Sequence, residues 1–228
     1  TIASEQHAWL DLAGPCSDVV ISTRVRLARN MVDIPFPARL DEGGRRELVE
    51  KVLRAASLSS SLTKARYIDM EEANKTERQF LMERHLISPE MAFDEHQRGV
   101  LIGPGQQVTL MINEEDHLRL QSFSPGLSLR QAFSKVNKAD NELGDHLTYA
   151  FDAEWGFCTR CPTNAGTGLR VSCLLHLPAL AASGDLERVL AGLAQMNVAA
   201  RGFYGAGSKA IGNLVQISNA MTLGHSEQ

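Results

Sequence analysis

Apolar and β-branched residues gather along the chain in short runs, some of which alternate with polar residues at the two-residue period of a half-buried strand. Most runs end at glycine, proline or asparagine, which is typical of strands that enter turns. The segment Gly103 to Gln106 separates two such runs and predicts a hairpin. Strands are predicted at residues 18–27, 99–102, 107–112, 148–157 and 171–177, with one or two more between 212 and 224.

Other segments repeat their apolar residues every three to four positions, which is the period of an amphipathic helix. In residues 41–58, Leu48, Val49, Val52 and Leu53 carry this pattern between charged residues. Two prolines make residues 31–40 an irregular connection instead. Helices are predicted at residues 41–58, 70–85, 127–145 and 186–196.

The predicted strands are numerous, and helices separate only some of them. This order favours an α+β fold, with an antiparallel or mixed sheet and helices packed mostly on one face. No internal repeat, low-complexity tract or long linker divides the 228 residues. We therefore expect one domain over residues 1–228.

Composition narrows the class of protein. Hydrophobic residues make up 43% and charged residues 22% of the chain, as in ordinary globular proteins. The net charge of −4 provides no general attraction to nucleic acid or membranes, and no apolar run approaches the ~20 residues that span a bilayer. The first residues lack the basic and apolar regions of a signal peptide, so we expect a cytoplasmic protein.

Without an export signal, the four cysteines are expected to be free thiols. Cys16 and Cys173 are interpreted as small buried residues. The Cys158-x-x-Cys161 spacing also admits zinc or redox chemistry, but no second pair of ligands follows at similar spacing, which makes that alternative the weaker one.

A polar loop leads into the predicted strand at 171–177 and is the first candidate site. Residues 158–170 hold two cysteines, a proline, two glycines and an asparagine, and Arg170 stands where the strand begins. Glycine and asparagine allow the backbone to turn and to approach a ligand closely. Loops of this kind, held by a rigid strand, commonly carry binding or catalytic residues.

A second candidate follows the strand at 107–112, where Glu114, Glu115 and Asp116 stand in a row. One interpretation is a solvated acidic turn. The other is a carboxylate base with Arg119 close by, and the position directly after a buried strand favours it.

Arginines form the third candidate. Arg24 and Arg26 fall on one face of the strand at 18–27, which also fits a solvated basic edge strand. If these arginines share a pocket with Arg119, Arg170 and Arg201, an anionic ligand must offset their charge. A nucleotide triphosphate with Mg²⁺ is such a ligand, because guanidinium groups bind phosphate oxygens bidentately. The chain contains neither a GxxxxGK[ST] loop nor the HRD and DFG motifs of ordinary protein kinases.

Four ordered motifs also carry a family resemblance: VISTRVRLARN (20–30), INEEDHLRLQ (112–121), CPTNAGTGLRVSCLLHLPAL (161–180) and RGFYGAGSKAIGN (201–213). Together they resemble the ATP:guanidino phosphotransferases, which include arginine and creatine kinases, over about residues 19–225. The resemblance implies a curved, mainly antiparallel sheet flanked by helices, as in the glutamine-synthetase-like catalytic domain of guanidino kinases.

The resemblance also implies a role for individual residues. Glu115 would hold and deprotonate the acceptor guanidinium, Cys161 would be a reactive thiolate beside it, and His85 would lie near the adenine. A small buried cysteine is the alternative interpretation of Cys161. Mg²⁺ would arrive with ATP and take no ligand from protein side chains. The implied nucleotide site comprises Ser22, Thr23, Arg24, Val25, Arg26, His85, Arg119, Arg170, Val171, Ser172, Cys173, Leu174, Arg201, Gly202, Phe203, Tyr204, Gly205 and Ala206.

Two features depart from the family pattern. Ala206 stands where a second catalytic glutamate is expected, so activity is expected to be impaired, by a factor of roughly 10²–10⁴ that is typical of acid–base groups. The family's small N-terminal helical domain and its C-terminal phosphoarginine-binding domain are expected to be absent.

The most similar branch is the bacterial protein arginine kinases, so the implied reaction moves the γ-phosphoryl group of ATP to arginine side chains of proteins. The implied partners are protein substrates with exposed arginines, an activator protein, the Clp protease machinery in a stress response, and a second copy of the chain. A kinase of free L-arginine and an inactive nucleotide- or arginine-binding module are the alternatives.

Overall fold

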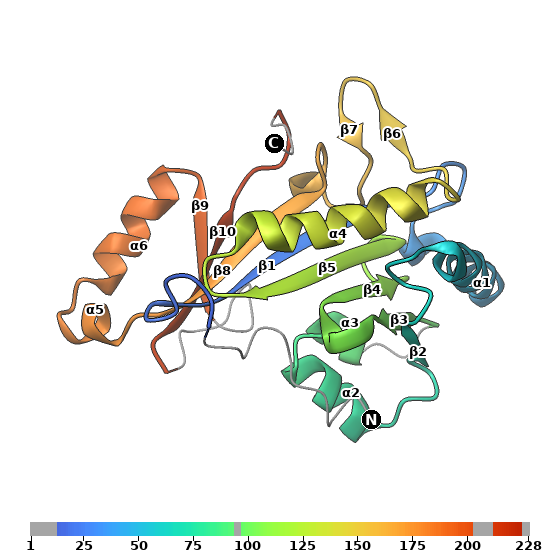
Figure 1. Ribbon diagram of the computed structural model, residues 1–228. Helices are drawn as coiled ribbons and strands as arrows, with labels where there is room; N and C mark the ends of the chain where they lie inside the picture. Colours follow the sequence, from blue (N-terminus) through green and yellow to red (C-terminus); the bar gives the residue numbers. More distant parts are fainter. Residues whose placement is uncertain (1–12, 94–96, 203–211, 225–228) are drawn as a thin grey trace.

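A computed structural model describes residues 13–93, 97–202 and 212–224. Its centre is an eight-stranded sheet in the order β2-β3-β4-β5-β1-β8-β10-β9, and every neighbouring pair of strands is antiparallel (Figure 1). Across the described ranges no helix is long and apolar enough to cross a bilayer. The strands are β1 (Val20–Arg29), β2 (Arg66–Asp69), β3 (Gly99–Ile102), β4 (Val108–Ile112), β5 (Leu118–Pro125), β8 (Leu169–His176), β9 (Val198–Gly202) and β10 (Leu214–Asn219).

One face of the sheet is apolar and carries the larger core. Side chains alternate along β1, so Val25 and Leu27 point to this face and are fully buried. Two long helices pack here, α1 (Glu42–Leu58) and α4 (Leu129–Gly144), and Figure 1 shows α4 lying along β1 and β5. Burial of this face is the main source of stability, since the free energy gained scales with the apolar area removed from water.

The opposite face is divided into two parts. Over β3 and β4, Val100, Ile102 and Met111 form a second core with α2 (Lys75–Glu83) and α3 (Pro89–Phe93), which lie below the sheet in Figure 1. Over β5, β1 and β8, the same face carries arginines and other polar residues. This polar part is where the candidate site lies.

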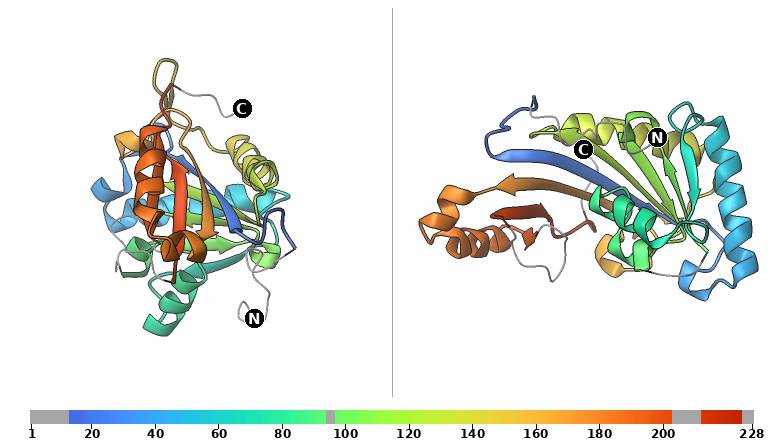
Figure 2. Two further views of the ribbon diagram at one scale, coloured as in Figure 1. Left: turned by 90° about the vertical axis from the view of Figure 1, so that its left-hand side faces the viewer. Right: turned by 90° about the horizontal axis from the view of Figure 1, so that it is seen from below.

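Smaller elements complete the described chain. The helices α5 (Pro178–Ala182) and α6 (Leu186–Gln195) lie at the β9 edge of the sheet, as both views in Figure 2 show. A separate two-stranded hairpin, β6 (Phe151–Asp152) and β7 (Gly156–Phe157), connects α4 to the loop that precedes β8. Short 3₁₀ turns occur at Pro37–Arg39, Pro104–Gln106 and Pro162–Asn164.

The α+β fold and most long elements agree with the sequence prediction, and four differences have a physical reason. The predicted strand at 148–157 is wrong, because Asp152 accepts hydrogen bonds from two backbone groups and turns the chain into the β6–β7 hairpin. The helix predicted at 70–85 begins later, at Lys75, because Asn74 and Glu77 form a capping box. Helices cover both faces rather than mostly one. The strands β2, β5 and β9 and the short helices α3 and α5 were not predicted.

Candidate active site

Strand register brings four guanidinium groups to one face of the sheet. Arg26 of β1 lies opposite Arg170 of β8, and Ala28, two residues further along β1, lies opposite Arg119 of β5. Arg24 shares this face through the two-residue period of the strand. Burial, followed by repulsion from Arg119 and Arg170, lowers the pKa of Arg24 to about 10, and the pKa of Arg26 falls for the same reasons. A pKa of about 10 keeps Arg24 a cation at neutral pH, so the cluster favours an anion.

The cluster is only partly neutralised by protein groups. Arg24 donates from Nη2 to Gln216 Oε1 at 3.1 Å and lies over the Phe123 ring, 5.8 Å from its centroid. Arg170 donates from Nη2 to Asn164 Oδ1 at 3.3 Å. Within the described ranges, the buried Nε of Arg26 has no hydrogen-bond partner. Because buried polar groups are nearly always paired, an unpaired guanidinium nitrogen beside other cations marks a site for phosphate-like oxygens.

An open hollow adjoins Arg24, and it is lined by Ser22, Arg24, His85, Phe123, Ser172, Leu174 and Gln216. An aromatic ring, an aliphatic side chain and several polar groups in one hollow suit a nucleoside. His85 follows α2 with a left-handed backbone (φ 57°), and its carbonyl accepts a hydrogen bond from Gln121 Nε2 at 2.7 Å. The structure thus places His85 beside Arg24, although the two are far apart in sequence.

Four of the residues predicted for the nucleotide site have side chains on the opposite face. Val25 lies in the main core and Val171 packs against it. The hydroxyl of Thr23 donates to the carbonyl of Gly126 at 2.7 Å. Cys173 is buried next to Thr23, and burial raises the pKa of its thiol. These four side chains do not line the hollow.

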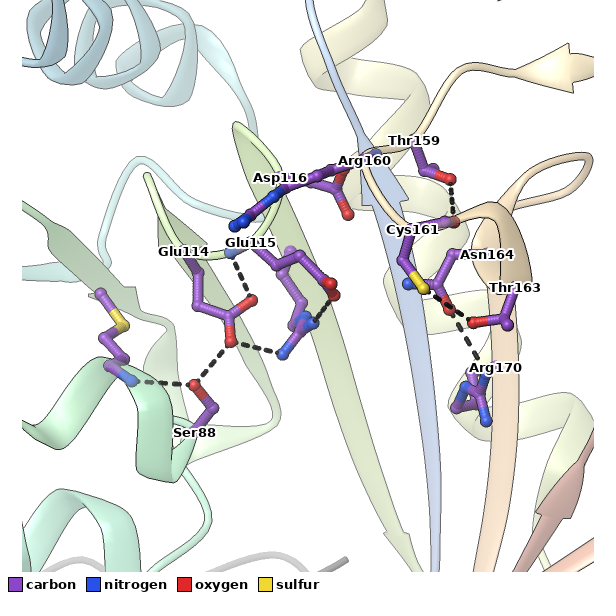
Figure 3. A network of polar contacts seen from close by, with 12 residues as sticks. Ser88, Glu114, Glu115, Asp116, Thr159, Arg160, Cys161, Thr163, Asn164 and Arg170 are labelled. Atoms are coloured by element: carbon purple, nitrogen blue, oxygen red, sulfur yellow. Dashed lines mark hydrogen bonds and ion pairs between the residues drawn. The ribbon is translucent and has the colours of Figure 1, made fainter. Parts of the chain in front are cut away.

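The acidic loop between β4 and β5 is held by Arg119. This arginine donates from Nη1 to Glu114 at 2.7 Å and from Nη2 to Glu115 at 3.1 Å. Glu114 is buried and also accepts a hydrogen bond from Ser88 at 2.7 Å (Figure 3). Glu115 is the more exposed carboxylate, with 35% of its side-chain surface accessible. The solvated acidic turn is therefore excluded for Glu114, and Glu115 is the carboxylate that remains accessible from solvent.

Glu115 and Cys161 lie at the same end of β1, on the two loops that flank it (Figure 3). Burial raises the pKa of Glu115, with the neighbouring Asp116 and Glu114 acting in the same direction and Arg119 opposing them. The half-buried thiol of Cys161 lies 3.1 Å from Thr163 Oγ1. A cationic group would fit between a carboxylate and a thiol in these positions.

A buried polar clamp fixes these two loops to each other. Asn30, at the end of β1, donates from Nδ2 to Asp116 Oδ1 at 2.7 Å and to the Cys158 carbonyl at 2.9 Å. Asp116 Oδ1 also accepts a hydrogen bond from the Arg160 backbone at 2.8 Å. Asn30 and Asp116 are almost inaccessible to solvent. The distance between Glu115 and Cys161 therefore depends on this pair.

His117 completes the clamp and has a structural role. Its Nδ1 accepts a hydrogen bond from the Met31 backbone at 3.0 Å, so Nε2 carries the proton and donates to the Pro35 carbonyl at 2.8 Å. Burial lowers the pKa of His117, which favours this neutral form. With both ring nitrogens engaged, His117 holds the loop in place and is not available as a base.

The four cysteines are free thiols, as predicted, but Cys16 is exposed and not buried. In the described ranges, no three His, Cys, Asp or Glu side chains gather as a metal site. Among the described residues that line the hollow none is a carboxylate, and Arg119 engages both Glu114 and Glu115. This donor set fits Mg²⁺ held by the phosphates of a nucleotide.

The last predicted segment lies mostly outside the described residues. Arg201 in β9 is the register partner of Gln216, which places its backbone beside the hollow. Gly202 ends β9, and Phe203, Tyr204, Gly205 and Ala206 lie outside the described ranges.

Several site residues were missed by the sequence reasoning. Phe123 and Gln216 line the hollow from β5 and β10, and Asn30 and Asp116 form the clamp. Asp116 stood in the acidic row without a role of its own, and Asn30 stood immediately after the strand that bears Arg24 and Arg26.

Solved structures of guanidino kinases share this fold. A duplicated taurocyamine kinase from Schistosoma mansoni, with bound components of a transition-state analogue, superposes with a TM-score of 0.84 at 24% identity over 97% of this chain and 33% of that chain. A lombricine kinase superposes with a TM-score of 0.81 at 24% identity over 98% of this chain and 66% of that chain. The fold is that of a guanidino kinase catalytic domain.

Sequence comparison specifies the family. Residues 46–228 match the model of the ATP:guanido phosphotransferase C-terminal catalytic domain, and the chain belongs to this family. It is 44% identical to a protein-arginine kinase of Halothermothrix orenii over 96% of this chain and 63% of that protein. It is 43% identical to the same kind of enzyme from Desulforamulus reducens over 100% of this chain and 65% of that protein. The chain thus spans less than two thirds of the length of these relatives.

Proposed function

We propose that this chain transfers the γ-phosphoryl group of ATP to arginine side chains of proteins. The observation that carries the proposal is the convergence of Arg24, Arg26, Arg119 and Arg170 beside the Glu115–Cys161 pair. The relatives described above, named protein-arginine kinases, support a protein substrate.

In this proposal the two halves of the site bind the two substrates. The nucleoside occupies the hollow beside His85 and Phe123, and the phosphates lie over the arginine cluster. The acceptor guanidinium lies between Glu115 and Cys161, at the other end of β1. Fixed guanidinium groups then stabilise the charge on the phosphoryl group in transfer, which is the main contribution to catalysis in such reactions.

The chemical step forms a nitrogen–phosphorus bond and breaks the bond between the γ-phosphorus and the bridging oxygen of ADP. A guanidinium has no free lone pair, so one proton must leave its nitrogen as the new bond forms. In this proposal Glu115 accepts that proton, and its raised pKa makes it a better base than an ordinary glutamate. Cys161, as a thiolate, would orient the same cation.

Family resemblance supports the wider proposal. Mg²⁺ would enter with the phosphates, an activator protein and self-association would regulate the enzyme, and phosphorylated proteins would be degraded by Clp-type proteases in the cytoplasm during stress. Ala206 would lower the rate without affecting nucleotide binding.

The direct test is incubation with Mg-ATP and an arginine-rich protein, followed by measurement of acid-labile phosphoarginine. We expect labelling of the protein that is lost in Glu115→Gln and enhanced in Ala206→Glu. Labelling of free L-arginine alone would instead identify a phosphagen kinase. Tight ATP binding without turnover, even in Ala206→Glu, would identify a binding module.

A further inference from the structure

The β6–β7 hairpin exposes two large aromatic side chains. Every residue from Phe151 to Trp155 is exposed, and Phe151 and Trp155 have 62% and 55% of their surface accessible. Figure 1 shows the hairpin projecting from the body of the domain. Neighbouring aromatic residues on a projecting hairpin are costly to leave in water and commonly mark a binding surface.

The hairpin is held in a fixed shape. Asp152 Oδ1 accepts hydrogen bonds from the backbones of Glu154 at 2.8 Å and Trp155 at 2.9 Å, which closes the turn. The Phe151 ring packs edge-on against Phe157, 5.1 Å between centroids. These contacts hold the backbone and Phe151, and Trp155 remains 55% exposed.

The hairpin is acidic as well as aromatic. Residues 147–159 contain Asp152 and Glu154 but no lysine or arginine. The backbone hydrogen bonds to Asp152 lower the pKa of its carboxyl group, so it is ionised at neutral pH. Carboxylates and aromatic faces are the two groups that bind guanidinium cations best, by charge-assisted hydrogen bonds and by cation–π contact.

The hairpin also stands at the acceptor end of the sheet. Tyr149, which precedes it, forms a bridge with Met31, just beyond the end of β1. Glu115 and Cys161 lie at this same end. Five residues lie between Trp155 and Cys161, so their Cα atoms are at most about 22 Å apart. A polypeptide that presents an arginine to Glu115 and Cys161 can therefore reach the hairpin with its neighbouring residues.

We propose that the β6–β7 hairpin is a docking surface for arginine-containing, basic segments of the substrate protein that flank the acceptor arginine. Trp155 and Phe151 contact the guanidinium planes, and Asp152 and Glu154 attract their charge. The inference rests on the proposed function, because it assumes that the acceptor is part of a polypeptide.

Binding can be measured without turnover. The chain has two tryptophans, Trp9 and Trp155, so a Trp9→Phe variant leaves Trp155 as the only reporter. We expect an arginine-rich peptide to change Trp155 fluorescence in a saturable manner. The same peptide with citrulline in place of arginine keeps the shape, loses the charge, and is expected to bind at least about tenfold more weakly. Equal binding of both peptides would overturn the proposal.

Charge reversal provides the second arm. In the Trp9→Phe background, Glu154→Lys is expected to weaken peptide binding about fivefold or more, because attraction becomes repulsion. Glu187→Lys makes the same change at an exposed position of α6 and is the matched control, expected to leave binding unchanged. If both variants weaken peptide binding equally, the effect comes from the net charge of the protein, and a local docking surface is refuted.

Kinetics separate this inference from the proposed function. Trp155→Ala is expected to raise KM for a protein substrate about fivefold or more while KM for ATP stays constant. If proteins are phosphorylated but Trp155→Ala leaves their KM unchanged, the docking surface is wrong and the kinase stands. If no protein is phosphorylated but the peptide binds at Trp155 as described, the kinase proposal fails and the binding surface stands.

Discussion

The buried clamp at the end of β1 leads to a prediction that separates stability from acceptor positioning. Replacing Asn30 by alanine removes three hydrogen bonds: two donated by Nδ2, to Asp116 and to the Cys158 carbonyl, and one accepted from the His117 backbone. One involves a carboxylate and two are between neutral groups. With about 1.5–3 kcal/mol for the first and about 1 kcal/mol for each of the others, the free energy of unfolding should fall by about 3.5–5 kcal/mol.

That cost is smaller than the total stability of a typical domain, so the variant should remain folded. Its Tm should fall by roughly 7–20 °C. The two loops that carry Glu115 and Cys161 would then move independently. A misplacement of about 1 Å can lower a rate roughly 10²-fold, so kcat/KM for the acceptor should fall by about that factor. The Kd for ATP should change by no more than about twofold, because the hollow shares no partner with the clamp.

Glu142→Ala is the matched control. Glu142 on α4 accepts three hydrogen bonds, from Ser59 at 2.6 Å, Ser60 at 2.5 Å and the Ser61 backbone at 2.9 Å. Removing the Glu142 carboxylate should lower Tm about as much as Asn30→Ala does, while kcat/KM for the acceptor stays unchanged. Thermal melts, ATP calorimetry and the alkylation rate of Cys161 complete the assay. Equal loss of acceptor kinetics in both variants, or weakened ATP binding in Asn30→Ala, would refute the positioning role.

Three further predictions concern charge. Arg26→Gln removes a buried guanidinium that lies beside other cations, so the ligand-free protein should have the same Tm or a higher one. The affinity for ATP should fall at least about tenfold. A large loss of stability would argue against the electrostatic reasoning. The raised pKa of Glu115 means that the folded protein holds this proton more tightly than the unfolded chain does. The free energy of unfolding should therefore fall as pH rises from about 4.5 through the raised pKa, and activity should appear over the same pH range. Denaturant titrations of Glu115→Gln at several pH values should not show this loss of stability. Asp140→Ala breaks the 2.7 Å buried pair with Arg29 and should destabilise the protein by about 3–5 kcal/mol, measured by denaturant titration, whereas a cost below about 1 kcal/mol would mean that Arg29 finds other partners.

The sequence was most informative where a local rule decides the structure. The helices α1 and α4 follow from apolar periodicity, and the common face of Arg24 and Arg26 follows from the strand period. Phe123 and Gln216 could not be assigned, because they join the hollow through the pairing of strands that are distant in sequence. The strand predicted at 148–157 failed because side-chain capping by Asp152 decides the turn. Strand alternation turns the side chains of Thr23 and Cys173 to the face opposite the arginines. The family resemblance nevertheless assigned both residues to the nucleotide site, because it covered whole segments and not individual side chains.

The alternation along β1 has a consequence for how the gene can change. Val25 and Leu27 contribute to the hydrophobic interior, and the alternate positions Arg24 and Arg26 contribute to the arginine cluster, so both depend on the same register of the strand. A substitution of one arginine alters ligand affinity and leaves the scaffold intact. An insertion or deletion of one codon within β1 would turn guanidinium groups inward and aliphatic groups outward at once. Length variation in this strand should therefore be rejected as unfolded protein before any selection on activity can act.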